Sequence, residues 1–126
     1  LNTPAVFGVY CMNLVFDWIL SEGGVEPISI RNTRKAGYIY KAIDQSEGFY
    51  RGFSRPECRS EMNITFRLPN KELDARFIEE AGEHAMSNLA GYRTLGGIRA
   101  SIYNAFPEKG CELMASFMND FASRNG

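Results

Sequence analysis

Two arginines close together in the sequence are the residues of this chain best suited to bind an acid. Arg93 and Arg99 flank the pair Gly96-Gly97 within residues 91–104. An arginine presents a planar fork of donors that matches carboxylate and phosphate oxygens, and a glycine lets the backbone approach a ligand closely or adopt a positive φ. The stretch therefore predicts a site for an anion with two acidic ends. On spacing alone, exposed arginines in weak ion pairs remain the alternative.

The other reactive side chains form no recognisable set. His84 is the only histidine, and it follows Glu83 in a predicted helix. One histidine cannot build a zinc site with cysteines this widely scattered, and no Ser/His/Asp set is suggested by spacing. We therefore expect no metal site, and we interpret His84 as a surface or boundary residue. Cys58 has arginines nearby on both sides, but we interpret it as an ordinary free thiol.

The composition and charge of the chain disfavour some classes of partner. Its 126 residues make one domain, or one domain with a piece of another. The formal net charge is −1, which gives no electrostatic reason to expect nucleic acid or an anionic membrane as a partner. The odd number of cysteines, three, argues against a disulfide framework and favours a reducing, cytoplasmic location.

The first segment predicts a helix that is apolar on every face. Thr3 is expected at the N-cap with Pro4 at the first helical position, and Gly23-Gly24 is expected to end the helix. Asp17 is the only charge between residues 4 and 20, a run that is short for a bilayer span. A helix of this kind must be covered on every side, and the rest of the chain could cover only part of it. We therefore expect the chain to be a C-terminal fragment of a larger protein.

The remaining elements are predicted from hydrophobic periodicity and turn residues. In chain order they are a helix over 27–43, a short aromatic strand over 49–53, a strand over 62–68, a helix from 73 to about 87, a strand over 98–102 and a helix that opens at Pro107. This order predicts an α+β fold: a small, mostly antiparallel sheet with helices on one face, preceded by the long apolar helix.

The same periodicity predicts which side chains are buried. In the second helix, four apolar residues fall near one face: Ile30, Ala36, Tyr40 and Ile43. The basic residues of that helix are expected to be largely exposed: Arg31, Arg34, Lys35 and Lys41. In the third helix, apolar residues recur at every fourth position: Leu73, Phe77, Ala81 and Ala85. In the last strand, a polar face points away from the apolar core and carries Arg99, Ser101 and Tyr103.

The stretch Gly91 to Asn104 closely resembles the C-terminal signature of the phosphoserine aminotransferase family, with Gly-Gly-Ile-Arg-Ala-Ser-Ile-Tyr-Asn at its centre. Further segments resemble the family in the same order and at similar spacing: Asn2-Thr3-Pro4 before the apolar helix, Gly23-Gly24-Val25, Ile43-Asp44-Gln45-Ser46 with Phe49-Tyr50, and Arg59 to Phe66. The resemblance covers essentially the whole chain.

This resemblance implies a pyridoxal-phosphate enzyme of the aspartate aminotransferase fold (fold type I), a homodimer with its active sites at the subunit interface. Residues 1–24 would be the end of the large, cofactor-binding domain, and residues 25–126 the small C-terminal domain. The Schiff-base lysine would lie upstream of Leu1. No catalytic residue is therefore expected in this chain, and the fragment alone is expected to be inactive.

The implied reaction transfers an amino group between 3-phosphoserine with 2-oxoglutarate and 3-phosphohydroxypyruvate with glutamate, in serine biosynthesis. By the same resemblance, Arg99 grips the substrate α-carboxylate and Arg93 helps bind the distal phosphate or γ-carboxylate. Asn2 and Thr3 match residues that reach the cofactor phosphate of the neighbouring subunit, so Thr3 would be both a helix cap and a phosphate contact. Tyr92 stands where many members have a histidine. Because its hydroxyl is neutral, a weaker attraction for the phosphate dianion is expected.

Two alternatives to this function stay open. One is a related pyridoxal-phosphate aminotransferase with another amino donor or acceptor. The other is a stand-alone α+β domain that binds a dicarboxylate through Arg93 and Arg99, and the apolar first helix speaks against it.

Overall fold

The computed structural model describes residues 3–126. Leu1 and Asn2 lie outside the described residues, so the predicted cofactor contact of Asn2 lies outside them too. The chain divides into two compact units, residues 1–31 and residues 32–126. The candidate residues Tyr92, Arg93 and Arg99 belong to the second unit.

Helix α1 spans Val6–Ser21 and has no side-chain cap at its start. Ala5 occupies the N-cap position, so the predictions that Thr3 caps this helix and that Pro4 is its first residue are wrong. The reason is local: the N–H of Val6 donates to the carbonyl of Pro4 at 2.8 Å, a turn tighter than a helical one. Pro4 therefore belongs to the turn that leads into the helix.

The end of α1 is set by two glycines. Gly23 and Gly24 have φ of 94° and 95°, in the left-handed region that is open to glycine. Their N–H groups donate to the carbonyls of Leu20 and Ile19, at 3.1 Å and 2.9 Å, which is the Schellman arrangement. The predicted stop at Gly23-Gly24 is confirmed.

Helix α1 has no buried residue. Phe7 is 79% exposed and Leu20 is 71% exposed. Further large apolar side chains are exposed along it: Val6, Val9, Tyr10, Met12, Leu14, Val15 and Phe16. The helix thus presents the kind of apolar surface that globular proteins normally cover. None of the helices within residues 3–126 combines the length and the hydropathy that crossing a membrane requires.

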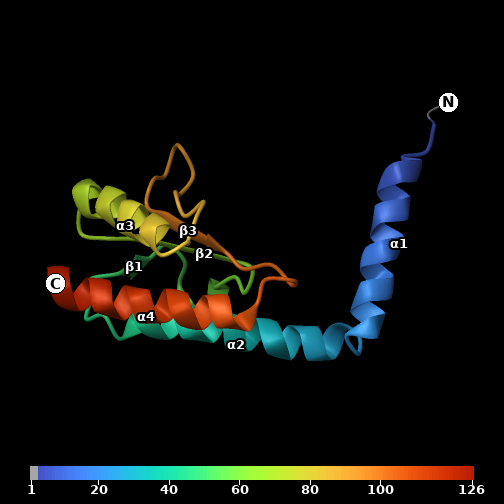
Figure 1. Cartoon of the computed structure of the whole chain (residues 1–126), viewed down its shortest axis with the longest axis horizontal. Helices are drawn as coiled ribbons and strands as arrows, with labels where there is room; N and C mark the ends of the chain where they lie inside the picture. The colour runs from blue at the N-terminus through green and yellow to red at the C-terminus, as the bar shows by residue number, and fades with distance from the viewer. Residues whose placement is uncertain (1–2) are drawn as a thin grey trace. The chain divides into compact units, whose positions relative to one another are not determined.

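The second unit is built on a three-stranded antiparallel sheet in the order β1-β2-β3. The elements of the chain after α1 are α2 (Val25–Asp44), β1 (Arg51–Gly52), the short 3-10 helix η1 (Pro56–Cys58), β2 (Asn63–Arg67), α3 (Lys71–Glu83), β3 (Ile98–Ser101) and α4 (Glu108–Asn125). Figure 1 shows α4 running along the later part of α2, where the Tyr38 hydroxyl donates to the Glu108 carboxylate at 3.3 Å.

The core lies on one face of this sheet. Ile64 and Phe66 of β2 and Ile98 and Ala100 of β3 are buried, and the residues between them are only partly buried. The same core contains side chains from all three helices of the unit, among them Ile39, Phe77 and Met118. One face of the sheet is therefore covered by helices and the other is polar, which confirms the predicted α+β fold with an antiparallel sheet.

Aromatic rings fill the centre of the core. Phe77 of α3 packs edge-on against Phe66 of β2, with ring centroids 5.8 Å apart. It also packs against Phe117 and Phe121 of α4, at 5.0 Å and 5.1 Å. Edge-to-face pairs of this kind add about 0.5–1.5 kcal/mol each to the free energy of area burial. Phe77 therefore ties α3 to both the sheet and α4.

Strand β1 is shorter than the aromatic strand predicted over residues 49–53. Phe49 and Tyr50 belong to the preceding turn, because their N–H groups donate to the carbonyl and the hydroxyl of Ser46, both at 2.9 Å. Only two residues remain to pair with β2. The two longer strands lie where the alternation predicts them.

Helix α3 ends at Glu83, earlier than the predicted end near residue 87. Ala85 is exposed and has a φ of 60°, so its predicted place on the buried stripe is wrong. The N–H groups of Ala85 and Met86 turn back to the carbonyls of Gly82 and Ala81, at 3.1 Å and 2.9 Å. The backbone thus closes a C-terminal motif and can no longer continue as a helix.

The buried stripe of α2 differs from the predicted one at two residues. Ile30 is 55% exposed, whereas Lys35 is fully buried; the exposure predicted for Lys35 is wrong. Ala36 and Ile43 are buried as predicted. Asn32, Lys35 and Ile39 are buried in addition, at intervals of three and four along the helix. Because Asn32 and Lys35 are polar, a search for apolar periodicity misses these two buried positions.

Candidate functional site

Residues 91–97 form a closed loop before β3. The N–H of Gly91 donates to the carbonyl of Gly97, and the N–H of Gly96 donates to the carbonyl of Tyr92, both at 2.8 Å. Gly96 and Gly97 each have a φ of 70°, which favours glycine. A Cβ on Gly91 would lie 2.0 Å from the carbonyl oxygen of Gly96. The glycines are therefore required by the shape of the loop itself.

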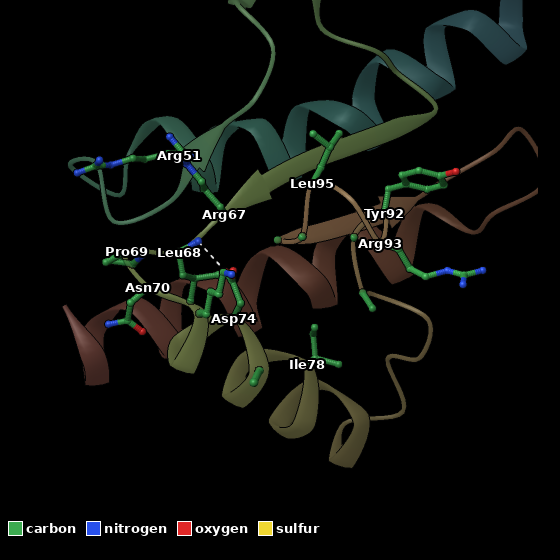
Figure 2. Close-up of a pocket in the computed structure, with 16 residues that line it drawn as sticks. Arg51, Arg67, Leu68, Pro69, Asn70, Asp74, Ile78, Tyr92, Arg93 and Leu95 are labelled. Carbon is green, nitrogen blue, oxygen red and sulfur yellow. Dashed lines mark hydrogen bonds between the residues drawn. The ribbon is translucent and has the colours of Figure 1, made fainter.

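A pocket of about 590 Å³ lies against this loop, the end of β2 and the start of α3 (Figure 2). Tyr92 and Arg93 line it from the loop, and Tyr92 is 65% exposed. Figure 2 shows both side chains extending to the same side of the loop. These two residues are consecutive in the chain, and the structure adds that both belong to the lining of one pocket.

Three further cations line the pocket: Arg51, Arg67 and Lys71. They come from β1, β2 and the start of α3, so no local sequence pattern links them to Arg93. Figure 2 shows Arg51 and Arg67 on the opposite side of the pocket from Arg93. The long-range pairing of the strands is what places these cations around one hollow.

The cations of this pocket do not converge on one point. Arg51 donates from Nε to the carbonyl of Gly48 at 3.2 Å, and the guanidinium of Arg67 lies over the ring of Phe53, 5.7 Å from its centroid. Apolar side chains line the pocket between them: Leu68, Ala75, Ile78 and Leu95. Arg93 is the cation that lines the pocket from the loop over residues 91–97.

Arg99 lies on β3 and is not among the residues that line this pocket. Its Cα partner across the sheet is Thr65 of β2, and its backbone N–H donates to the carbonyl of Leu89 at 2.8 Å. Its guanidinium Nε is buried and has no hydrogen-bond partner within residues 3–126. The Nε atoms of Arg31 and Arg59 are in the same state, so this feature alone does not distinguish Arg99 from them.

A row of polar side chains continues from Arg99 along the outer face of the sheet. The Ser101 hydroxyl donates to Oδ1 of Asn63 at 2.9 Å, and Nδ2 of Asn63 donates to the Tyr103 hydroxyl at 3.1 Å. Asn63 and Ser101 are Cα partners, so these bonds cross from β2 to β3. The sequence analysis predicted this polar face but did not assign Asn63 to it.

On the core side, Lys35 holds the segment that follows β3. Its side chain is fully buried, and its ammonium Nζ donates to a group of carbonyls: Ile102 at 3.1 Å, Tyr103 at 2.7 Å, Asn104 at 3.4 Å and Phe106 at 3.2 Å. A charged donor to backbone carbonyls makes stronger bonds than a neutral one. The backbone just beyond the Arg99 strand is therefore fixed from within the core.

The remaining reactive side chains lie away from this site. Burial raises the pKa of the Cys111 thiol to about 11, although the nearby charge of Lys35 acts in the opposite direction. Cys58 is exposed, and His84 is exposed at the C-cap of α3, which confirms its interpretation as a surface residue. In the part of the chain that the structure describes, no three His, Cys, Asp or Glu residues are grouped to hold a metal ion.

Comparison with known proteins decides the family of this chain. Residues 1–114 match the pattern of aminotransferase class-V. The match includes the loop over 91–97 and all of β3. The chain belongs to the aminotransferase class-V family. Arg93 and Arg99 both lie within the segment of the class-V match.

The curated relatives of this class-V chain include phosphoserine aminotransferases. That of Herpetosiphon aurantiacus is 51% identical over 125 residues, which cover 99% of this chain and 35% of that protein. The chain thus spans about a third of the length of the curated relatives it matches.

Solved structures of the same family have the same fold. A phosphoserine aminotransferase from Bacillus circulans subsp. alkalophilus superposes with a TM-score of 0.91 at 47% identity, covering 99% of this chain and 35% of that one. A phosphoserine aminotransferase from Trichomonas vaginalis, with pyridoxal phosphate bound, superposes with a TM-score of 0.82 at 34% identity, covering 93% of this chain and 34% of that one.

Proposed function

We propose that this chain is the C-terminal part of a phosphoserine aminotransferase. The reaction would transfer an amino group between 3-phosphoserine with 2-oxoglutarate and 3-phosphohydroxypyruvate with glutamate, in serine biosynthesis. The proposal is supported by the 51% identity to a phosphoserine aminotransferase over 99% of the chain. Residues 1–24 would end the large domain, and residues 25–126 would form the small one.

The observation that carries the proposal is this identity, because the matched stretch contains the loop and strand that hold Arg93 and Arg99. The guanidinium of Arg99 would hold the substrate α-carboxylate in the fork geometry that such groups prefer. Holding the carboxylate at two points would fix the Cα–H bond of the substrate in one orientation. Correct orientation of the reacting bond is a large part of the catalytic effect in such a reaction.

Arg93 and Tyr92 would meet the distal acid of the substrate, the phosphate of phosphoserine or the γ-carboxylate of glutamate. Both residues line the same pocket, and both extend to the same side of the loop (Figure 2). Arg93 would supply the charge and Tyr92 a neutral hydroxyl. The two acidic groups of the substrate would thus be bound by different residues of the stretch over 91–104.

The start of α1 is compatible with a phosphate contact of pyridoxal phosphate. Its first turn has no side-chain cap and no acidic residue, so none of the described side chains caps the helix or repels an anion there. Because Thr3 does not cap the helix, its hydroxyl can serve the phosphate alone. When bound, the cofactor supplies the electron sink for cleavage of the Cα–H bond. The lysine that holds it would lie in the larger part of the protein.

The whole enzyme would be a cytoplasmic homodimer with active sites at the subunit interface. The exposed apolar side chains of α1 support a larger assembly, because such a surface is normally covered. The net charge of −1 supports small molecules rather than nucleic acid or membrane as partners. The isolated chain would be inactive.

The test of this function is the substitution Arg99→Ala in the full-length enzyme. We expect kcat/KM for phosphoserine to fall about 100-fold or more, because a charged bidentate contact is lost. Arg99→Lys keeps the charge and should retain part of the activity. As a matched control, Arg76→Ala removes an exposed arginine that pairs with Glu80 at 2.8 Å and should leave kcat/KM near wild type. An active Arg99→Ala enzyme would contradict the proposal.

A second candidate is a related pyridoxal-phosphate aminotransferase with another substrate, and Tyr92 is the residue that favours it. In the full-length enzyme, Tyr92→His should lower the KM for phosphoserine about two- to fivefold at pH 6, where the imidazole is charged, and less at pH 8. Steady-state kinetics at both pH values measure the effect. An unchanged KM at pH 6 would mean that the tyrosine does not limit attraction for the phosphate.

A further inference from the structure

Tyr103 is an exposed residue on the face of the sheet that carries Arg99. The ladder continues past β3, since the N–H of Ile102 donates to the carbonyl of Met62 at 2.9 Å. Ile102 is buried and Tyr103 is 58% exposed, so the alternation of the strand persists through this point. Tyr103 therefore stands four residues after Arg99 on the same polar face.

The phenol of Tyr103 is held in place by its neighbours in the polar row. Ser101 donates its hydroxyl hydrogen to Oδ1 of Asn63 at 2.9 Å. Nδ2 of Asn63 donates to the Tyr103 hydroxyl oxygen at 3.1 Å, since an amide nitrogen is a donor and not an acceptor. The phenol is the acceptor in this bond. Its own hydrogen is left to donate to something else.

The backbone of Tyr103 is fixed from the other side of the sheet. The buried ammonium of Lys35 lies 2.7 Å from its carbonyl oxygen, the shortest of the bonds that this ammonium makes to the segment. An exposed tyrosine normally keeps its rotamer freedom, and ordering it costs entropy. Here both ends of the residue are ordered before any ligand binds, which is the property expected of a recognition residue.

Arg99 alone does not satisfy a carboxylate. A carboxylate has about four lone-pair sites, and a bidentate guanidinium occupies two of them. Four residues of extended chain separate the Cα atoms of Arg99 and Tyr103 by ~13 Å, a gap that two long side chains can close around a small acid. A phenol hydroxyl on this face can therefore reach a lone pair that the arginine leaves open.

We propose that Tyr103 is a further substrate-binding residue, whose hydroxyl donates a hydrogen bond to the carboxylate that Arg99 holds. Asn63 and Ser101 are positioning residues that aim this hydroxyl, and they touch no substrate themselves. The inference rests on the proposed function, because the acid in question is the α-carboxylate of an amino-acid substrate. Glutamate and phosphoserine share that group, so both substrates should depend on Tyr103 equally.

The experiment compares wild type with Tyr103→Phe in the full-length enzyme carrying pyridoxal phosphate. Dissociation constants for glutamate and for phosphoserine are measured from the change in cofactor absorbance, and the melting temperature is measured alongside. Tyr103→Phe should weaken both substrates by the same factor, about tenfold, with an unchanged melting temperature. Tyr38→Phe is the control, because it also removes a phenol bond, to Glu108, but on the helical side of the sheet. It should bind both substrates like wild type.

The variant Ser101→Ala tests the positioning role of Asn63 and Ser101. Removing this donor frees the amide of Asn63 to turn, so substrate binding should weaken by a smaller factor than in Tyr103→Phe. The double variant should be no weaker than Tyr103→Phe alone, since the row acts only through the phenol. Additive losses in the double variant would overturn this positioning role.

The outcomes separate the two proposals. Wild-type enzyme whose cofactor absorbance does not respond to glutamate or phosphoserine overturns the proposed function, and this inference falls with it. A responsive wild type together with a Tyr103→Phe enzyme of unchanged affinity overturns the inference alone. A loss that appears only with one substrate, or only with a matching fall in melting temperature, also overturns it, because a contact with the shared carboxylate predicts neither.

Discussion

The residue that decides the local geometry of this chain is Lys35, a charged side chain buried without exposure to solvent. It sits among the backbone carbonyls that follow β3, with the closest contact to Tyr103 at 2.7 Å. Asn32, one helical turn before it, donates its amide to Oδ1 of Asn104 at 2.8 Å. The Lys35 ammonium and the Asn32 amide nitrogen are hydrogen-bonded, as buried polar groups usually are, whereas Oδ1 of Asn32 is buried with no partner within residues 3–126. The pair anchors the connection between β3 and α4 to α2.

Replacing Lys35 by methionine is expected to destabilise the protein by about 2–4 kcal/mol, because buried carbonyls lose a charged donor while the apolar stem is kept. Urea unfolding followed by circular dichroism measures the loss. Lys41→Met on the same helix is the matched control: Lys41 is exposed, and a substitution there should change the free energy of unfolding by no more than about 0.5 kcal/mol. Equal effects of the two substitutions would contradict the role given to Lys35.

At the scale of elements, the end of α3 shows how a helix can stop without glycine. The N–H of Met86 donates to the carbonyl of Ala81, and that of Ala85 donates to the carbonyl of Gly82, which together form a Schellman motif. The residue in the left-handed position is Ala85, with a φ of 60°. A Cβ in this conformation costs about 1–2 kcal/mol. The motif is therefore kept at a cost in backbone strain.

Ala85→Gly is expected to stabilise the protein by about 1 kcal/mol, because glycine adopts the left-handed conformation without that strain. The same substitution within α3, Ala75→Gly, should destabilise it by about 1 kcal/mol, since Ala75 is an exposed residue in the helix interior. Thermal unfolding of both variants against wild type gives the comparison. Two changes of the same sign would mean that Ala85 is not strained.

At the scale of the whole molecule, the core contains two acids that are kept protonated. Burial raises the pKa of the Cys111 thiol to about 11, and it also raises the pKa of the Tyr50 phenol well above its usual value. The Tyr50 hydroxyl donates to the carbonyl of Met118 at 2.8 Å. Both groups titrate at lower pH in the unfolded chain, where they are solvated. The unfolded state therefore binds fewer protons than the folded state above about pH 9.

The stability of the protein should therefore fall as pH rises from about 9 towards 11, by up to about 1 kcal/mol per pH unit from the thiol above about pH 9 and by a similar amount from the phenol above about pH 10. Denaturant unfolding at a series of alkaline pH values measures this slope. Cys111→Ala should flatten the slope between pH 9 and pH 10, because one of the two acids is gone. Ile64→Val, which disturbs the core and removes no titratable group, should keep the wild-type slope. A slope that Cys111→Ala leaves unchanged would exclude the thiol as its source.

The positions of the elements could be read from the sequence wherever a strong local signal exists. The alternation of Ile64 with Phe66 and of Ile98 with Ala100 predicts two strands and their buried faces, and Gly23-Gly24 predicts the end of α1. These signals are local because strand alternation and left-handed glycine depend on the residue and its immediate neighbours. The prediction is wrong at Thr3, because the turn closed between Pro4 and Val6 places Ala5 at the N-cap position.

The same contrast between local signals and long-range packing applies to the predicted site. Residue type and spacing by themselves predicted a glycine pair between two arginines and the polar face of the last strand, whereas the roles of Arg93 and Arg99 come from the family resemblance and stay predictions. Only the tertiary structure decided that Arg51 and Arg67 share a pocket with Arg93, and that Lys35 is buried behind the strand of Arg99. Strand pairing and helix packing join residues far apart in the chain. The residues next to Lys35 in the sequence therefore do not predict which distant carbonyls its buried ammonium binds.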